Sequence, residues 1–277
     1  MVKWILNDNS VSNNLSRQVS SISSINRLPD YIKREIYARI IAPELLERLH
    51  ISPQLLSEEG VDLLKLNYPS ESPSVEMALF HKPDFEDPVF FGHLTDNLMG
   101  QVHILLYIVN DPDSPRFDVD RMPDGRKTLF GTLCRNIEAE KAAMEFGLAP
   151  GQIRRGLRLL YPAIRSFEGF VRSLGHDLYF TEPLYYHNAI IFEHYGFAYA
   201  KGKKLMERIQ KGFSDMGELI NKLDDSSPFR SPSAATSIRK RSWAIHDGIL
   251  GEPFTDVTMF KQVGKSAGLD TSSGCGW

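Results

Sequence analysis

The residues best suited to chemistry gather in a single stretch, residues 178–197, which run LYFTEPLYYHNAIIFEHYGF. A run of apolar residues, a proline turn and a Gly-Phe pair predict a short buried strand, a tight turn and a short helix. In α/β folds, ligands bind beyond the carboxyl end of a strand, before the helix that follows it. A carboxylate, a phenol, an imidazole and a carboxamide at this position indicate proton transfer and the binding of a polar group. The candidate catalytic residues are therefore Glu182, Tyr186, His187 and Asn188.

The aromatic residues of this stretch have a second interpretation. Tyr185, Tyr186, Phe192 and Tyr195 fall at helical spacing. Aromatic side chains bury large areas and are common in cores. We therefore keep a structural role open for each of them beside the functional one.

A second candidate site precedes a predicted long helix. The helix has apolar residues at steps of three and four from Ile153 to Leu174, and Pro162 must either kink it or mark its true start. Unpaired N–H groups at a helix start bind phosphate, and arginines add charge-assisted contacts. An ordinary capped helix start with exposed arginines is the alternative. The candidate phosphate-binding residues are Gly151, Gln152, Ile153, Arg154, Arg155 and Gly156.

Other polar groups carry weaker signals. The acidic residues between Asp111 and Asp124 lack the spacing of an EF-hand loop, and turns explain them better. The eight histidines form no HxxxH or HxH pair, so no metal site is expected. His246 and Asp247 could orient a base in a hydrolase, but neighbours in an extended chain point to opposite faces and no nucleophile motif accompanies them.

The elements that position these residues form a mixed α/β or α+β pattern. A helix is expected from Asp30 to Ile41, and a Ser/Pro-rich loop over residues 225–240. We expect a flexible arm over residues 1–27, one domain over 28–264 and a flexible tail over 265–277. Alternating or continuous apolar residues predict strands at 63–68, 75–80, 89–94, 102–109, 178–181 and 256–263, and a further short strand at 128–133.

Composition excludes several classes of partner. The 277 residues carry a net charge of −3 and no basic stripe, so no nucleic-acid partner is expected. Two cysteines, one in a Ser/Gly tail, suit a reducing compartment. The apolar run in residues 1–8 is too short for a signal peptide. No apolar run approaches the ~18 residues that span a bilayer, so no membrane partner is expected. We expect a cytoplasmic protein.

Three segments resemble the GNAT superfamily of acyl-CoA-dependent N-acyltransferases. The helix around Asn188–Ile190 with its Gly196–Phe197 exit, the turn Gln152–Leu157 and the closing strand Asp256–Lys261 carry the resemblance. It covers about residues 89–197 and that last strand. The fold that it implies has a mixed, mainly antiparallel central sheet flanked by helices, here with extra N-terminal helices and a long late loop.

The resemblance also implies an activity. The backbone from Gln152 to Gly156 would hold the pyrophosphate of acetyl-CoA or another acyl-CoA, and Asn188 would lie near the thioester. Glu182 or His187 would be the base, and Tyr185 or Tyr186 the acid. A backbone N–H at a splayed strand would polarise the acyl carbonyl. The acceptor would be the amine of a small molecule or peptide, and exposed aromatic side chains would suit a homodimer.

The chain departs from the family pattern at Ile153 and Arg158 in the turn, and at Phe192, where the family often has its acid tyrosine. The helix between Asn188 and Gly196 is also shorter than usual, and residues 136–146 are predicted to form a helix where the family has a strand. These departures favour an alternative function, a non-catalytic ligand-binding or scaffolding protein with the same fold.

Overall fold

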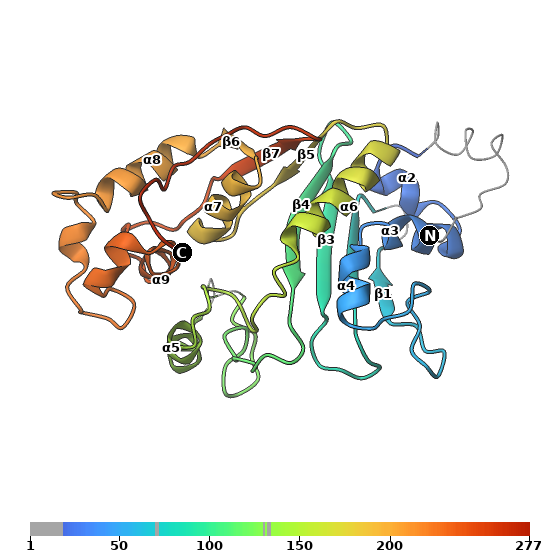
Figure 1. Ribbon diagram of the computed structural model, residues 1–277, viewed down its shortest axis with the longest axis horizontal. Helices are drawn as coiled ribbons and strands as arrows, with labels where there is room; N and C mark the ends of the chain where they lie inside the picture. The colour runs from blue at the N-terminus through green and yellow to red at the C-terminus, as the bar shows by residue number, and fades with distance from the viewer. Residues whose placement is uncertain (1–18, 70–71, 130, 132–133) are drawn as a thin grey trace. The chain divides into compact units, whose positions relative to one another are not determined.

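The computed structural model describes residues 19–69, 72–129, 131 and 134–277. The chain divides into two compact units, whereas the sequence analysis expects one domain over 28–264 (Figure 1). Unit 1 comprises Met1–Val109, Arg158–Phe180 and Gln262–Gly264. Unit 2 comprises Asn110–Leu157, Thr181–Lys261 and Lys265–Trp277.

Unit 1 is built on an antiparallel meander of four strands. They are β1 (Leu64–Asn67), β2 (Ser74–Leu79), β3 (Phe90–Asp96) and β4 (Val102–Val109), and β4 is followed in the sheet by β5 (Leu178–Thr181). In β2, buried and half-buried side chains alternate along the strand. This is the pattern of a strand with one face on a core. The strands predicted from apolar patterning are therefore confirmed to within two residues at their ends.

Strand β4 contains a β-bulge. Leu94 of β3 faces Ile104 and the preceding residue, His93, faces Leu106, so Leu105 has no partner on β3. The alternation of burial also ends there, because Val102 and Ile104 are buried whereas residues 105–109 are half-buried. A bulge leaves backbone groups outside the regular ladder and bends its strand.

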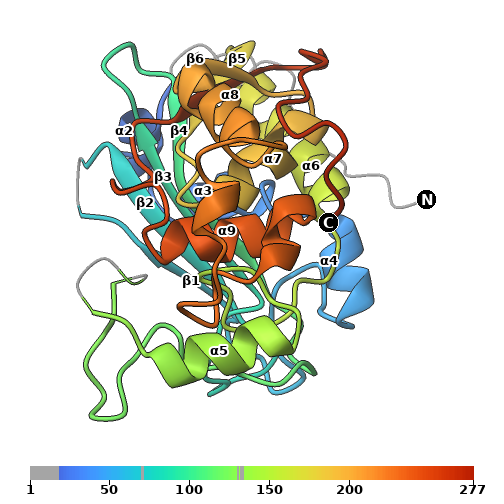
Figure 2. The same ribbon diagram turned by 90° about the vertical axis from the view of Figure 1, so that its left-hand side faces the viewer.

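Helices cover one face of this meander. Helices α3 (Asp30–Ala38), α4 (Pro43–Arg48) and α6 (Leu160–Ser173) lie on the same side of the strands (Figures 1 and 2). The rings of Tyr37 in α3 and Phe170 in α6 lie 6.5 Å apart in the core. Because α6 begins at Leu160, Pro162 lies in its first turn, where the missing N–H costs no helical hydrogen bond. Of the two roles predicted for this proline, marking the helix start is correct.

Part of the segment expected to be a flexible arm is helical. Helix α2 (Ile22–Asn26) buries Ile22 and Ile25 and is capped by Ser21. The carboxylate of Asp96 in β3 accepts hydrogen bonds from the N–H groups of Ile22 (2.7 Å) and Ser23 (2.8 Å). Residues 1–18 of that predicted arm lie outside the described residues.

Unit 2 is mainly helical. It contains α5 (Ile137–Glu145), α7 (Tyr186–His194), α8 (Lys203–Gly212) and α9 (Ile238–His246). An antiparallel pair, β6 (Ala198–Lys201) and β7 (Thr258–Gln262), accompanies them, with 3₁₀ turns at Ile220–Lys222 and Pro232–Thr236. A core of Val119, Ala143, Leu148, Phe229 and Trp243 lies beneath α5 and α9.

Two segments of unit 2 are more ordered than the sequence predicts. The late loop predicted over 225–240 contains a 3₁₀ turn and the start of α9. The segment 265–277, expected to be a loose tail, makes defined contacts. Thr271 donates its N–H (2.8 Å) and its hydroxyl (2.6 Å) to the buried carboxylate of Glu193 in α7. The N–H of Ile238 donates to the carbonyl of Gly276 (2.7 Å).

The fold class is confirmed as α+β, with mainly antiparallel strands flanked by helices. Of the strand predicted at 128–133, residues 130, 132 and 133 lie outside the described residues, and Thr128 and Leu129 are not in a strand. In the described part of the chain, no helix combines the length and apolar character needed to cross a bilayer.

Asp96→Asn tests the attachment of α2. The neutral amide cannot accept the charge-assisted hydrogen bonds at the helix start, each worth about 1.5–3 kcal/mol. We expect urea unfolding to show a loss of about 2 kcal/mol and limited proteolysis to cut earlier near residue 20. Asp84→Asn, at an exposed loop residue, is the matched control and should leave both unchanged. Equal stability of the two variants would contradict the anchoring role.

Candidate functional site

The four predicted catalytic residues differ strongly in exposure. Glu182 follows β5 and is exposed, whereas Asn188 in the first turn of α7 is half-buried. Tyr186 and His187 are buried, with 0% and 2% of their surfaces exposed. Glu182 is thus the member of this set that solvent or substrate reaches most easily.

His187 is held as a neutral imidazole. Its Nδ1 lies 2.8 Å from Ser242 Oγ of α9, and its Nε2 lies 3.2 Å from the side-chain nitrogen of Asn188. The amide of Asn188 must donate to Nε2, so Nδ1 carries the proton and donates to Ser242. Burial, followed by the electrostatic effects of Arg239 and His246, lowers the pKa of His187 to about 3. Both ring nitrogens are occupied, so this imidazole is a positioned structural group rather than an available base.

Tyr186 is protonated at neutral pH. Burial raises the pKa of its phenol to about 12, although the charge of Arg241 opposes the shift. The neighbouring Tyr185 is half-buried, and burial also raises the pKa of its phenol. Both phenols therefore keep the proton that a general acid would have to deliver.

The candidate phosphate-binding turn is not the first turn of a helix. Helix α6 begins at Leu160, four residues after Gly156, which corrects the placement predicted from the sequence. The reason is a set of hydrogen bonds to an earlier loop. Asp111 N–H donates to the carbonyl of Arg155, and Phe117 N–H donates to that of Ile153, both at 2.8 Å. Backbone groups used in this way cannot form a helix.

Some of the turn's own N–H groups are also engaged. Gln152 N–H donates to the carbonyl of Ala149 (3.2 Å), and Arg155 N–H donates to Ser114 Oγ (3.1 Å). The guanidinium of Arg154 donates to the carbonyl of Ser114 (2.5 Å). The turn is therefore fixed against the loop that precedes it, and Arg155 is its exposed cation.

Unit 2 brings this turn next to the residues at the start of α7. Gly151 has φ +77°, and a Cβ on it would lie 2.4 Å from the ring of Tyr185. The Tyr185 ring in turn stacks on His187, with 5.7 Å between ring centroids. The two candidate sites found in the sequence thus adjoin each other through Gly151 and Tyr185.

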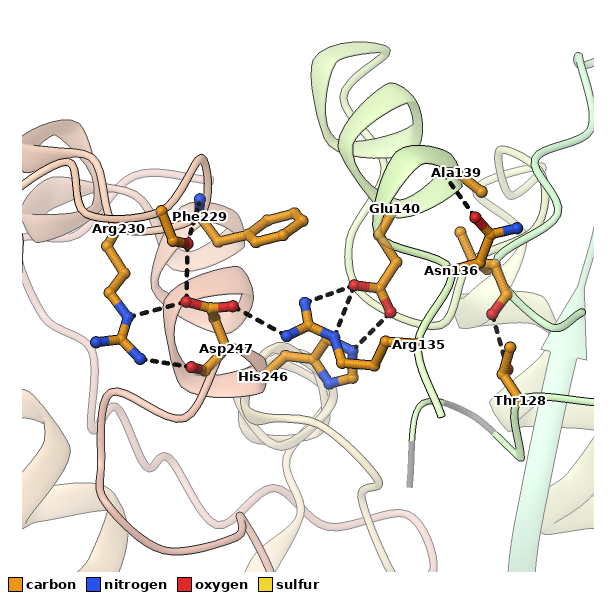
Figure 3. Close-up of polar contacts among 11 residues, drawn as sticks. Thr128, Arg135, Asn136, Ala139, Glu140, Phe229, Arg230, His246 and Asp247 are labelled. Atoms are coloured by element: carbon orange, nitrogen blue, oxygen red, sulfur yellow. Dashed lines mark hydrogen bonds and ion pairs between the residues drawn. The ribbon is translucent and has the colours of Figure 1, made fainter. Parts of the chain in front are cut away.

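A group of charged residues beside them was not predicted as a unit. We call Arg135, Glu140, Arg230, His246 and Asp247 the charged cluster; they come from the loop before α5, from α5, from the late loop and from the end of α9 (Figure 3). In Figure 3, the guanidinium of Arg135 lies between the carboxylates of Glu140 and Asp247. The cluster therefore connects segments that are about 100 residues apart in the chain.

Glu140 is the most buried member, with 2% of its surface exposed. Arg135 donates to its Oε2 from Nε (2.9 Å) and from Nη2 (2.5 Å), and His246 Nε2 lies 3.1 Å from Oε1. Burial acts to raise the pKa of Glu140, but the hydrogen bonds from His246 and Arg135 outweigh it and hold the pKa below its ordinary value. The carboxylate is therefore ionised at neutral pH.

Asp247 completes the cluster on the other side. Its Oδ1 accepts from Arg135 Nη1 (2.9 Å), while its Oδ2 accepts from Arg230 Nε (2.9 Å) and Ser227 Oγ (2.8 Å). Burial acts to lower the pKa of Arg135, but Glu140 and Asp247 together raise it. Each charge thus has a partner of opposite sign.

Among the residues that the structure describes, the crevice beside the charged cluster leaves no room for a substrate. A crevice lined by Glu140, Gly151, Tyr185 and His246, among others, is too narrow for a water molecule. A Cβ on Gly131 would lie 2.5 Å from the imidazole of His246, so this edge of the ring is covered too. His246 and Asp247 contact different partners and not each other, which removes the arrangement that a hydrolase would use. We interpret the cluster as a structural clamp.

One signal in the sequence could have found this clamp. Glu140 is three residues before Ala143 on α5, and these two residues form the buried face of the helix. A glutamate on an inward-facing position must find a partner. The identity of that partner, however, depends on Arg135 and on His246, which is 106 residues later.

The acidic loop behaves as predicted. Arg116 forms ion pairs with Asp118 and, at 2.8 Å, with Asp120, and Asp111 and Asp124 accept N–H groups two residues later in Asx turns. Over the described ranges, no three His, Cys, Asp or Glu side chains are placed to hold a metal ion.

Comparison with protein-family models, curated proteins and solved structures finds no match to this chain.

Glu140→Gln tests the clamp and its pH dependence. The substitution leaves Arg135 and His246 without the buried charge, so we expect a loss of about 3 kcal/mol at pH 7 in urea unfolding. A carboxylate whose pKa is lowered by folding stabilises above its unfolded pKa, about 4.3, and the stabilisation disappears as pH falls through the folded pKa. The difference in the free energy of unfolding between wild type and variant should therefore become smaller below about pH 4.

Glu145→Gln, at an exposed position of the same helix, is the control for this series. It should follow the wild type at every pH. If the free energy of unfolding of Glu140→Gln differs from that of the wild type by the same amount from pH 7 to pH 3, an ionised and paired Glu140 is contradicted.

Gly151→Ala tests the contact between the two candidate sites. An added methyl would overlap the Tyr185 ring, at a cost of about 1–3 kcal/mol. Gly125→Ala is the matched control, since Gly125 also has positive φ (+86°) but has nothing within 4 Å of an added Cβ. Thermal unfolding should show a clearly lower midpoint for Gly151→Ala than for Gly125→Ala. Equal midpoints would mean that Tyr185 does not pack on Gly151.

Proposed function

We propose that the protein is an acyl-CoA-dependent N-acyltransferase that acts on the amine of a small molecule or peptide. The observation that carries the proposal is the contact in unit 2 between the turn Gly151–Gly156 and the start of α7, through Tyr185. These are the two segments that the resemblance assigns to the pyrophosphate and to the thioester. Their contact is what a shared acyl-CoA site requires.

One further observation supports the proposal. The turn, α6, β5 and α7 follow one another in the loop–helix–strand–helix order on which the resemblance rests, although α5 precedes the turn where the family has a strand.

The exposed carboxylate of Glu182 is the best candidate for the base. In the reaction, the amine nitrogen forms a bond to the thioester carbonyl carbon, the C–S bond breaks, and the amine proton moves to the base while the thiolate takes one from an acid. His187 is a poor base because it is buried and both of its ring nitrogens are occupied. Tyr185 and Tyr186 both retain their protons, and the half-buried Tyr185 fits the role of the acid better than Tyr186, which is completely buried.

Two observations favour the alternative of a non-catalytic binding protein. Phe192 stands where the family often has its acid tyrosine, and it packs against Phe197 with ring centroids 4.9 Å apart. Tyr186 is completely buried. A protein that keeps the fold and binds acyl-CoA without turnover would tolerate both.

For either function we propose a cytoplasmic location, supported by Cys134 and Cys275, which are both free thiols.

Calorimetric titration with acetyl-CoA, followed by an assay of acyl transfer to a panel of amines, tests the proposal. We expect saturable binding, and in Glu182→Gln a fall in kcat of about 100-fold or more with unchanged acetyl-CoA affinity, because only proton transfer is lost. Glu218→Gln, at an exposed carboxylate of the same unit, is the control and should keep full activity.

Two results would redirect the interpretation. Binding of acetyl-CoA without transfer to any amine would favour the non-catalytic alternative. No binding at millimolar acetyl-CoA by folded protein would overturn the acyl-CoA proposal itself.

A further inference from the structure

Two arginines of unit 2 converge at the C-terminal end of α5. The guanidinium carbon of Arg155 lies 4.8 Å from the ring centroid of Phe146. A Cβ on Gly147 would lie 3.1 Å from Nη1 of Arg239, so that guanidinium packs closely against the Gly147 backbone. Because Phe146 and Gly147 are consecutive, the two cations share one small region of the surface.

These arginines lack the partners that other arginines of the protein have. Arg116, Arg135 and Arg230 each pair with carboxylates. Among the residues that the structure describes, the guanidinium groups of Arg155 and Arg239 form neither an ion pair nor a hydrogen bond. Two neighbouring cations without a counter-charge attract an anion from solution.

The electrostatics of Arg239 agree with this geometry. Burial lowers the pKa of Arg239, and the positive charge of Arg155 lowers it further. Arg239 is half-buried, so its charge is only partly screened by water. An anion bound between the two cations would attract both and offset their mutual repulsion.

Aromatic rings hold the two guanidinium planes. Phe146 lies beside Arg155, and the ring centroid of Trp277 lies 5.6 Å from the guanidinium carbon of Arg239. Stacking of this kind fixes the plane of a guanidinium and leaves its N–H edge available for bidentate contacts with phosphate oxygens. The Trp277 side chain is itself 52% exposed, so its ring also offers a surface for a planar group.

We propose that Arg155 and Arg239 form a binding site for a phosphate group. Each guanidinium would donate two N–H groups to a phosphate dianion, with Phe146 and Trp277 behind them. The proposal extends the phosphate-binding role proposed for the turn Gly151–Gly156, to which Arg155 belongs, but it does not rest on acyl transfer, because phosphate can bind here whether or not the chain transfers acyl groups. It also adds a residue from α9 that the turn Gly151–Gly156 does not supply.

Titration of the full chain with inorganic phosphate at constant ionic strength tests the site. Binding should be saturable, should change the fluorescence of Trp277 and should raise the thermal midpoint of the wild type. Arg155→Gln and Arg239→Gln should each weaken binding about tenfold or more, since each removes charge-assisted hydrogen bonds. Arg208→Gln, which removes an exposed arginine paired with Glu252, is the control and should bind like the wild type.

The midpoint without phosphate separates a binding role from a structural one. Arg155 is exposed and is repelled by Arg239, so Arg155→Gln should unfold at or above the wild-type temperature while losing its response to phosphate. No saturable binding by folded wild type would overturn the proposal. Wild-type affinity in Arg155→Gln and Arg239→Gln would overturn it equally.

Competition experiments distinguish the source of the phosphate. If it belongs to a nucleotide, 3′,5′-ADP should displace inorganic phosphate at lower concentration, and Trp277→Phe should weaken only the nucleotide. If it is a free phosphate, the two ligands should compete equally. If the protein binds phosphate but not acetyl-CoA, the phosphate site is supported and the acyl-CoA proposal is overturned. If it binds acetyl-CoA but not phosphate, and neither arginine substitution changes the acetyl-CoA affinity, the phosphate site is overturned and the acyl-CoA proposal is supported.

Discussion

Unit 2 depends on one buried carboxylate. Glu140 can be buried because Arg135 and His246 both contact its carboxylate, and Arg135 also pairs with Asp247. The clamp thereby fixes the end of α9 against α5 (Figure 3). Other polar residues also lie on α9 or contact it. His187 is hydrogen-bonded to Ser242 on α9, and Tyr185 lies beside His246. Arg239 lies in the first turn of the same helix.

The strands of unit 1 could be predicted because their burial follows a local rule. Alternating side chains such as Val75, Met77 and Leu79 face a core, and that period is visible in the sequence without knowledge of any partner. The strand, turn and helix of residues 178–197 were found for the same reason, with Gly196 at φ +81° ending the helix as expected. Local patterns therefore predicted the elements and placed Glu182 correctly between a strand and a helix.

The remaining features depend on distant partners. The turn at Gly151–Gly156 resembles a helix start in sequence, but the loop near Asp111 uses its carbonyl groups and delays the helix to Leu160. Helix α9 has a Ser/Pro-rich approach that resembles a loop, and burial of Trp243 stabilises it as a helix. In both segments the conformation depends on distant residues, which a window of neighbouring residues does not contain. For the same reason the sequence shows that Glu140 needs a buried partner but does not show that Arg135 and His246 supply it.

The two units draw on the chain discontinuously. Residues 262–264 complete unit 1, where Val263 N–H donates to the carbonyl of Asp177 and Gly264 N–H donates to Glu168. The following residues return to unit 2 and reach Glu193 and Ile238. Neither unit can therefore be expressed intact as one uninterrupted fragment, and during synthesis each must wait for residues after 261. Long sequence separations between contacting residues slow folding. A chain cut before residue 262 would leave two incomplete units rather than one finished and one missing.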